Sequence, residues 1–329
     1  MKEVPGQGAN RHRFSIGARP GACAAAYNRA LLGPAPRHFL TGKELDSGEL
    51  RSLLGRALEL KAERTAGLGA TALGGRTVAL YFERPSTRTR VSFQIAVDEL
   101  GGNPLPLRAD ELQLGRGESI GDTARVLSRY LHAIVIRSSS DETVAELAAA
   151  AGVPVVNALT PLHHPCQALA DLLTLRERFD ALEGLTVAYV GDGNNVARSL
   201  AILGRVAGVE VRVASPPGYE LEPGLATLET ADPAEAVAGA DAIYTDVWVS
   251  MGDEAEAERR RSDLAPFQVS SELLSGAAER AIVLHCLPAH PGEEITADVL
   301  YGERSAVWDQ AENRLHAQKA LLERLLGTS

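Results

Sequence analysis

The chain has 329 residues, which is longer than one hydrophobic core usually serves, so its length predicts two domains. A formal net charge of −10 at pH 7 argues against a nucleic-acid partner, and no apolar run reaches the roughly 18 to 20 residues that cross a membrane. The cysteines, Cys23, Cys166 and Cys286, show neither disulfide nor zinc-ligand spacing, which is typical of a cytoplasmic protein.

Residues 1–35 differ in composition from the rest of the chain. Glu3 is their one acidic residue, and several arginines are scattered among glycine, alanine and proline. This composition predicts a poorly ordered extension. A targeting segment is the alternative, because transit peptides are also rich in arginine and poor in acids, although the glycines and prolines would spoil an amphipathic helix.

Short apolar runs alternate with amphipathic segments from Ser47 onward. The first helix is predicted by the spacing of Leu50, Leu53, Leu54 and Ala57. Strands are predicted at T-V-A-L-Y-F, N-P-L-P-L, H-A-I-V-I-R, V-P-V-V-N-A, L-T-V-A-Y-V-G, V-E-V-R-V-A-S, D-A-I-Y-T-D-V-W and A-I-V-L-H-C-L. Further helices are predicted between them, among others at 86–100, within 119–130, at 165–179 and at 311–326.

This alternation predicts an α/β fold of two doubly wound domains with parallel sheets. The pattern restarts near Glu183–Gly184, which marks the predicted domain boundary. One domain is predicted at 36–180 together with the C-terminal segment 311–329, and the other at 184–310. The active site is expected in the cleft between them, because ligands of such folds bind beyond the carboxyl ends of the strands.

Polar or cationic residues follow every predicted strand end that could contribute to such a site. They are Ser86–Arg90, Arg137, His164 with Gln167, Gly191–Asn195, Asp246–Gly252 and Cys286–Pro288. The densest group is S-T-R-T-R at 86–90, at the start of a predicted helix. Free backbone N–H groups at a helix N-terminus, added hydroxyls and a guanidinium fork together indicate a phosphate site. The alternative is that Ser86 only caps the helix and the arginines are solvated; a Walker loop is absent from the sequence.

Six motifs in this order resemble those of the aspartate/ornithine carbamoyltransferase family. They are S-T-R-T-R, H-P-C-Q, G-D-G-N-N, D-V-W-V-S-M-G, H-C-L-P and A-E-N-R, and the resemblance runs from about Pro36 to Leu326. The D-V-W-V-S-M-G and H-C-L-P motifs are similar to those of the ornithine branch. The resemblance implies transfer of a carbamoyl group from carbamoyl phosphate to L-ornithine, which gives L-citrulline and phosphate in arginine metabolism, without a metal or organic cofactor.

The same resemblance implies that domain 36–180 binds carbamoyl phosphate. The carbonyl oxygen of carbamoyl phosphate would receive hydrogen bonds from Thr89, Arg137 and His164. The Gln167 amide oxygen would accept from the carbamoyl NH2. The residues expected to bind carbamoyl phosphate are Ser86, Thr87, Arg88, Thr89, Gln113, Arg137, His164, Gln167 and Arg314. Those expected to act in catalysis are Arg88, Arg137, His164, Cys286 and Arg314.

Domain 184–310 would bind ornithine. Asn195 is expected at the α-carboxylate and Asp246 at the α-ammonium, with Cys286 and Leu287 at the δ-amine. Further contacts are expected from Ser250 and Met251. Family members have a cis peptide bond before the proline of H-C-L-P, so we expect one at Leu287–Pro288. The Cys286 thiol need not be a nucleophile, because the amine can attack carbamoyl phosphate directly.

The family resemblance also implies a homotrimer, with Gln113 reaching the site of the neighbouring subunit. Three departures from the family pattern stand out: Arg84 where lysine is usual, Pro291 where bacterial relatives usually have arginine, and a shortened stretch between Tyr219 and Asp246. The sequence leaves open whether the reaction runs in arginine synthesis or in reverse, in arginine breakdown.

Three other functions fit parts of the sequence. A dinucleotide-dependent oxidoreductase would use the glycines of G-D-G-N-N, but Val196 stands where its third glycine belongs and no acidic residue ends the next strand. A phosphate-sensing module without catalysis would not need Asp246 and Cys286. A carbamoyltransferase for putrescine or a modified ornithine remains an alternative, although an intact S-M-G motif disfavours putrescine.

Overall fold

The structure, a computed structural model, describes Met1 and residues 36–84, 86–108, 117–249 and 254–327. From Arg37 onward the chain forms one unit. Three predicted site residues, Gln113, Ser250 and Met251, lie outside the described residues. Among the described helices none is long and apolar enough to cross a membrane.

The first sheet has four parallel strands in the order β2-β1-β3-β4. They are β1 (Thr77–Phe82), β2 (Asn103–Arg108), β3 (Ala133–Arg137) and β4 (Val155–Leu159). β1 and β3 have apolar side chains that are buried on both faces, as expected of parallel strands covered by helices. Phe39 extends the β4 edge, since its N–H donates to Val155 O and its carbonyl accepts from Asn157 N.

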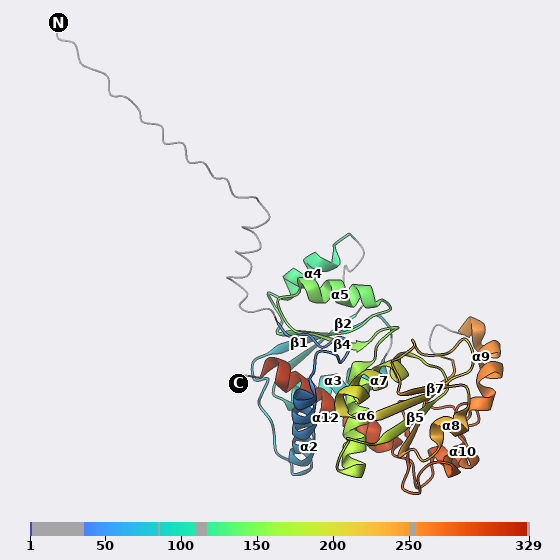
Figure 1. Ribbon diagram of the computed structural model, residues 1–329. Helices are drawn as coiled ribbons and strands as arrows, with labels where there is room; N and C mark the ends of the chain where they lie inside the picture. Colours follow the sequence, from blue (N-terminus) through green and yellow to red (C-terminus); the bar gives the residue numbers. More distant parts are fainter. Residues whose placement is uncertain (2–35, 85, 109–116, 250–253, 328–329) are drawn as a thin grey trace. The chain divides into compact units, whose positions relative to one another are not determined.

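Helices cover both faces of this sheet (Figure 1). One face packs on α2 (Ser47–Thr65), α3 (Thr87–Glu99), α6 (Pro165–Phe179) and α12 (Val307–Leu326), and the other on α4 (Ile120–Leu127) and α5 (Asp141–Ala150). Several helices begin at a residue whose side chain accepts from the first turn. Asp46 does so for α2 in a reciprocal pair with Glu49, which also bonds the Asp46 N–H.

The second sheet has five parallel strands in the order β7-β6-β5-β8-β9. They are β5 (Thr186–Val190), β6 (Glu210–Ala214), β7 (Leu228–Thr230), β8 (Ala242–Thr245) and β9 (Ile282–His285). One face packs on α7 (Asn195–Ala207), and the other on α8 (Pro233–Val237), α10 (Ser271–Ser275) and α11 (Ala297–Leu300). Helix α9 (Ala257–Leu264) lies between the 3-10 turns Glu254–Glu256 and Ala265–Phe267. The two sheets confirm the predicted α/β fold with parallel sheets.

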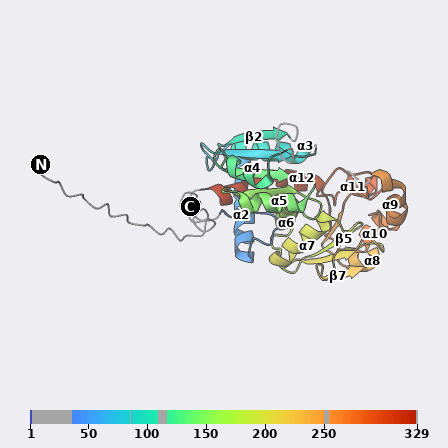
Figure 2. The ribbon, with the colours of Figure 1, turned by 90° about the horizontal axis from the view of Figure 1, so that it is seen from above.

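Helix α6 joins the two sheets, because residues from Pro165 to Leu175 are all buried. Most of these residues are apolar, and the buried polar ones, Gln167, Asp171 and Thr174, are hydrogen-bonded. The apolar side chains of α6 belong to one continuous core that includes Leu80 of β1 and Tyr189 of β5. Helix α12 runs beside α6, α2 and α3 (Figures 1 and 2). The contacts between the sheets are therefore made mainly through these two helices.

The closing helix starts at Val307, four residues before the predicted start. Its first turn reads V-W-D-Q, whose β-branched and aromatic residues carry no strong helix signal. Tertiary contacts stabilise this turn. Val307 is buried among apolar side chains of the second sheet and its helices, and Gln310 is buried and hydrogen-bonded to His285 and Asp171.

In each sheet the first strand in the chain lies inside the sheet, and later strands are added first on one side of it and then on the other, so the strand order reverses at one point. In the first sheet this point lies between β1 and β3, and in the second it lies between β5 and β8. Ligands of doubly wound folds bind beyond the carboxyl ends of the strands at such points. The strand ends at these points are those after Phe82, Arg137, Val190 and Thr245, and the ends of β4 and β9 lie next to them in the two sheets.

Candidate active site

The S-T-R-T-R segment lies at the start of α3, beyond the end of β1. Ser86 is the N-cap residue, yet its hydroxyl accepts no hydrogen bond from the described backbone of the helix. Arg88 is exposed, and its NH2 donates to the carbonyl oxygen of Leu287 at 2.7 Å. Arg137 ends the neighbouring strand β3 and is half-buried. The alternative in which Ser86 only caps the helix is therefore not supported by its hydrogen bonds.

Arg314 of α12 brings three of the predicted residues together. Its NH1 donates to Gln167 Oε1 at 2.5 Å and its NH2 donates to Thr89 Oγ1 at 2.7 Å. His164 Nε2 lies 3.5 Å from the same NH1. His164 is also the N-cap residue of α6, and its backbone N–H donates to Ser199 Oγ at 2.7 Å. Four residues from three distant parts of the sequence, the starts of α3 and α6 and the middle of α12, thus form one buried cluster.

The electrostatics of this cluster favour an anion and a neutral imidazole. Burial, followed by the charges of Arg314, Arg137 and Arg88, lowers the pKa of His164 well below 6.5. Burial and neighbouring arginines also lower the pKa of Arg137, because each cation disfavours the next. Binding of a phosphate dianion among these cations would lower their free energy, because it would relieve their mutual repulsion.

The carboxyl ends of β5 and β8 carry the second group. Asp246 is buried, and its Oδ2 accepts from Asn194 Nδ2 at 2.9 Å. Asn194 also caps α7, since its Oδ1 accepts from the N–H groups of Val196 and Ala197. The predicted carboxylate ligand Asn195 donates from Nδ2 to the carbonyl of Thr160 at 2.7 Å. This bond joins the start of α7 to the loop that precedes His164.

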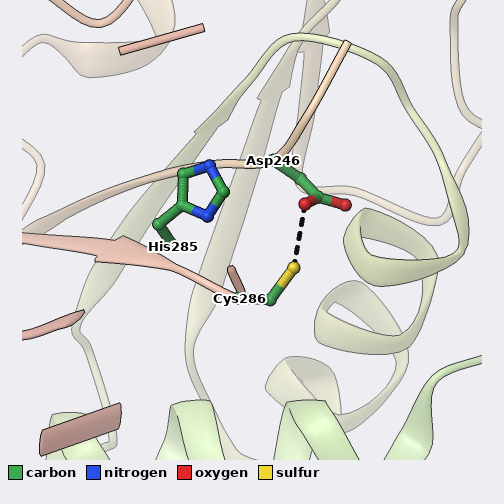
Figure 3. Close-up of side chains that lie close together, drawn as sticks. All are labelled: Asp246, His285 and Cys286. Atoms are coloured by element: carbon green, nitrogen blue, oxygen red, sulfur yellow. Dashed lines mark hydrogen bonds between the residues drawn. The ribbon is translucent and has the colours of Figure 1, made fainter. Parts of the chain in front are cut away.

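Cys286 follows β9 and faces Asp246 (Figure 3). Its Sγ donates to Asp246 Oδ1 at 2.9 Å. Burial, then the Asp246 charge and hydrogen bond, raises the pKa of this thiol well above 9. The thiol is therefore protonated at neutral pH, which makes it a hydrogen-bond donor rather than a nucleophile.

Asp246, His285 and Cys286 have ligand atoms close enough to surround a metal ion. The imidazole is already committed on both sides. His285 Nδ1 accepts from the Leu287 N–H at 2.8 Å, and Nε2 lies 3.1 Å from the buried carboxylate of Glu294. Because metal binding needs a free imidazole nitrogen, the hydrogen bonding fits a structural histidine that orients the H-C-L-P segment.

The H-C-L-P segment has an unusual backbone. The Leu287–Pro288 peptide bond is cis, as expected from the resemblance. Leu287 has a φ of 59°, which is uncommon for a residue with a Cβ. Both of its backbone polar groups are satisfied, one by His285 and one by Arg88. These two contacts hold the left-handed backbone in place.

Arg260 of α9 holds the described residues that lead into the S-M-G segment. Its Nε donates to the Trp248 carbonyl at 2.6 Å, and its NH2 pairs with Asp192. The guanidinium also lies over the Tyr219 ring, 5.1 Å from the centroid. Sequence reasoning missed Arg260, because it is one of three consecutive arginines in a charged helix and nothing in that pattern distinguishes it.

The G-D-G-N-N turn lacks room for a dinucleotide pyrophosphate at Gly193. A Cβ on Gly193 would lie 2.7 Å from both Leu221 N and Tyr219 O. The Gly193 N–H also donates to Tyr219 O at 2.8 Å. The chain's own backbone therefore covers the glycine that would approach a pyrophosphate in a dinucleotide-binding fold, which disfavours the oxidoreductase alternative.

Two family domains match the two parts of the chain that contain these sheets. Residues 37–177 match the family domain described as "Aspartate/ornithine carbamoyltransferase, carbamoyl-P binding domain". Residues 183–325 match "Aspartate/ornithine carbamoyltransferase, Asp/Orn binding domain". The chain therefore belongs to the aspartate/ornithine carbamoyltransferase family.

Similar proteins within the family are named for ornithine. The ornithine carbamoyltransferase of Acidothermus cellulolyticus is 54% identical over 303 residues, which is 88% of this chain and 96% of that protein. The solved structure of ornithine carbamoyltransferase from Pyrococcus furiosus is 48% identical, with a TM-score of 0.85 over 89% of this chain and 97% of that one. The structure from Thermus thermophilus is 47% identical, with a TM-score of 0.82 over 88% and 99%.

Proposed function

We propose that the protein transfers the carbamoyl group of carbamoyl phosphate to the δ-amine of L-ornithine, which gives L-citrulline and phosphate. The observation that carries this proposal is the contact between the two strand-end groups. Arg88, at the start of α3 where the phosphate is proposed to bind, donates directly to the carbonyl oxygen of Leu287. Leu287 follows Cys286, whose thiol donates to Asp246. A donor substrate and an amine bound at these two groups would lie next to each other.

The first group supplies what carbamoyl phosphate needs. The start of α3 and Arg88 offer N–H donors to the phosphate, with Ser86 and Thr87 beside them. Arg137, Thr89 and His164 would direct donors at the carbonyl oxygen, which gains negative charge when the amine attacks. Arg314 is bonded to Thr89 and Gln167, so it can reach the same substrate.

The second group supplies what ornithine needs. Asp246 is a buried acceptor suited to the α-ammonium. Asn195, which follows the Asp246 partner Asn194 at the start of α7, is the proposed ligand of the α-carboxylate. Cys286 and the Leu287 backbone would meet the δ-amine, while Ser250 and Met251 complete the proposed site. The neutral amine adds to the carbonyl carbon, the C–O bond to phosphate breaks, and the amine proton leaves with the phosphate, so no covalent enzyme intermediate is required.

The test is product formation by the purified protein with carbamoyl phosphate and, in separate reactions, ornithine, putrescine and aspartate. Turnover confined to ornithine is the expected result. Turnover with putrescine in place of ornithine would contradict the proposed role of the α-carboxylate ligands. Binding of phosphate analogues without any carbamoylated product would favour the sensing module instead.

The two sheets also support a proposed division of labour along the chain. We assign carbamoyl phosphate binding to 36–180 with 311–329, and ornithine binding to 184–310. Helix α12 packs against α2, α3 and α6, which favours its place in the first domain. Residues 1–35 are left as an extension outside both domains.

We also propose that the protein is a homotrimer in which Gln113 reaches the neighbouring site. Support comes from apolar side chains on α3 and the edge strand β2, where Val91, Ile95 and Leu105 are 44%, 36% and 39% exposed. Pro104 and Pro106 remove N–H donors from this edge, so side chains rather than strand pairing would make the contact. Analytical ultracentrifugation should give three times the chain mass of 34.9 kDa, and a monomer would contradict it.

The proposed setting is arginine biosynthesis in the cytoplasm. Citrulline is the product that a route from ornithine to arginine requires. The cytoplasmic assignment rests on the absence of disulfides among the described cysteines, since Cys166 and Cys286 are both free thiols.

A further inference from the structure

Asp171 is a fully buried carboxyl group one helical turn after Gln167, and no sequence motif drew attention to it. Its Oδ1 accepts hydrogen bonds from three side chains on three elements. Gln167 Nε2 of α6 lies at 2.8 Å, Gln310 Nε2 of α12 at 2.7 Å and the Tyr244 hydroxyl of β8 at 3.2 Å. Asp171 Oδ2 has no hydrogen-bond partner among the described residues.

We propose that Asp171 is a positioning residue that fixes which end of the Gln167 amide faces carbamoyl phosphate, and that it thereby sets the preference for a carbamoyl NH2 over a methyl group. This inference rests on the proposed function, because it assigns carbamoyl phosphate to the site beside Gln167.

The chemistry of the two groups determines the orientation of the amide. A glutamine amide has a donor end and an acceptor end, and an ionised carboxylate can only accept. If the carboxyl group is protonated, the proton belongs on Oδ2, because Oδ1 already receives three donors. In both states only the Gln167 Nε2 can face Asp171. Its Oε1 must therefore face the opposite way, into the site.

Arg314 meets the other end of the same amide. Its NH1 donates to Gln167 Oε1 at 2.5 Å, and a guanidinium has no acceptor atom. Gln167 is thus held between an acceptor on one side and a donor on the other. Its Oε1 has a second lone pair, which can accept from a substrate NH2 while the Arg314 bond is kept. The proposed substrate acceptor is therefore oriented before the substrate arrives.

The orientation matters because carbamoyl phosphate and acetyl phosphate differ at this one group. Both carry a phosphate and a carbonyl, but acetyl phosphate has a methyl group where carbamoyl phosphate has NH2. A site that hydrogen-bonds the NH2 discriminates against the methyl analogue, since its acceptor is then left without a partner. A reversed Gln167 amide would place NH2 against NH2 and lose this preference.

The Asp171→Asn variant tests the proposal, because an asparagine can present either a donor or an acceptor, which leaves Arg314 as the one described partner that still dictates the orientation of the amide. The KM for carbamoyl phosphate should rise about tenfold, whereas the inhibition constant of acetyl phosphate against carbamoyl phosphate should change less than about twofold. The KM for ornithine should stay within about twofold. If both carbamoyl phosphate and acetyl phosphate weaken by the same factor, Asp171 has only a structural role and the proposal is overturned.

Tyr244→Phe is the matched control. It removes one donor from the same Oδ1 and keeps the ring, so the ratio of the two affinities should not change. A ratio that falls as far as in Asp171→Asn would also overturn the proposal, since the Tyr244 hydroxyl bonds to Asp171 and leaves the Gln167 amide with both of its own partners.

A polarity-conserving double variant decides the matter if Asp171→Asn fails to fold. In Gln167→Glu with Asp171→Asn the negative charge moves by one turn, residue 167 can only accept, and the asparagine introduced one turn later can donate to it. The preference for carbamoyl phosphate over acetyl phosphate should stay within about threefold of the wild type, and its loss would overturn the proposal. Wild-type protein that forms no citrulline would instead overturn the proposed function, and this inference with it.

Discussion

The Arg88 guanidinium donates to the carbonyl oxygen of Leu287 at 2.7 Å, although the two residues are 199 positions apart. The contact joins the start of α3 to the H-C-L-P segment after β9. A phosphate that binds at the helix start competes for the same guanidinium. Binding of carbamoyl phosphate is therefore expected to alter the contact between Arg88 and the Leu287 backbone, at the proposed site of the δ-amine.

Replacement of Arg88 tests its proposed role on the phosphate. Arg88→Ala should lower kcat/KM by at least about 1,000-fold, because it removes transition-state stabilisation as well as binding. Arg88→Lys keeps the charge but loses the fork that matches phosphate oxygens, so it should fall between the wild type and the alanine variant. Steady-state citrulline formation measures both. Near-normal turnover of Arg88→Ala would rule out the phosphate assignment.

Cys286 offers a test of direct amine attack. Its thiol donates to Asp246 Oδ1, and a serine hydroxyl can make the same bond. Cys286→Ser should therefore keep kcat/KM for ornithine within about tenfold of the wild type, while Cys286→Ala should lose more. A nucleophilic thiol predicts another pattern, in which both variants are inactive.

The raised pKa of the same thiol predicts low reactivity toward alkylating agents. Iodoacetamide at pH 7.5 should modify Cys286 much more slowly than a free cysteine, because the thiolate is the reacting species. Mass spectrometry of the peptide that contains Cys286 gives the rate. Rapid modification would show that the thiolate is populated at this pH.

Arg260 is predicted to affect the binding of ornithine and not the binding of carbamoyl phosphate. It fixes the Trp248 carbonyl, two residues before the proposed ligand Ser250. Arg260→Met should raise the KM for ornithine about tenfold and leave the KM for carbamoyl phosphate within about twofold.

The neighbouring Arg259 provides the control. It is exposed, and its NH2 pairs with Glu256 on the same turn. Arg259→Met should behave as the wild type, since an exposed pair of this kind contributes about 0 to 1 kcal/mol. Equal effects of the two substitutions would mean that the charge of α9, and not the Trp248 contact, governs ornithine binding.

The sequence predicted the parts of the fold and the candidate site that depend on local pattern. The alternation of strands and helices predicted two parallel sheets, and the segment Pro165–Phe179 was predicted with the bounds that α6 has. The strand-end rule led to Arg88, Arg137 and Asp246, because polar residues after a buried strand are visible in the sequence. The cis bond before Pro288 came from the resemblance alone.

The residues that sequence reasoning missed act through partners that are distant in the chain. Asp171 and Gln310 are 139 residues apart, and their hydrogen bond depends on how α6 packs against α12. Asn194 was overlooked beside Asn195, although it has the larger set of partners: it caps α7, accepts from Tyr189 and donates to Asp246. Burial and pairing of such groups follow from tertiary packing, which no spacing along the chain records.

The pH dependence of stability tests the neutral state of His164. Its pKa in the folded protein lies well below the ordinary value of 6.5, while the unfolded chain takes up a proton near 6.5. The unfolded state therefore binds more protons below pH 6.5, and the free energy of unfolding falls as the pH falls. His38 and His316 act in the same direction, because burial lowers their pKa values too.

Asp171 acts in the opposite direction. Burial raises the pKa of Asp171 from 3.8 to about 7. Between these pH values the folded state binds more protons than the unfolded state, so the contribution of Asp171 to stability decreases as the pH rises through that range. The total profile thus mixes opposite slopes, and a single variant is needed to separate them.

His164→Gln separates them, because glutamine does not titrate. Urea unfolding of wild type and variant should be compared from pH 5 to pH 8. Above about pH 7 the difference in unfolding free energy should be constant. Below pH 6.5 the wild type should lose stability relative to the variant by up to about 1.4 kcal/mol per pH unit, the value for one proton. Parallel profiles over the whole range would mean that the pKa of His164 is not lowered in the folded protein, and would contradict the neutral imidazole.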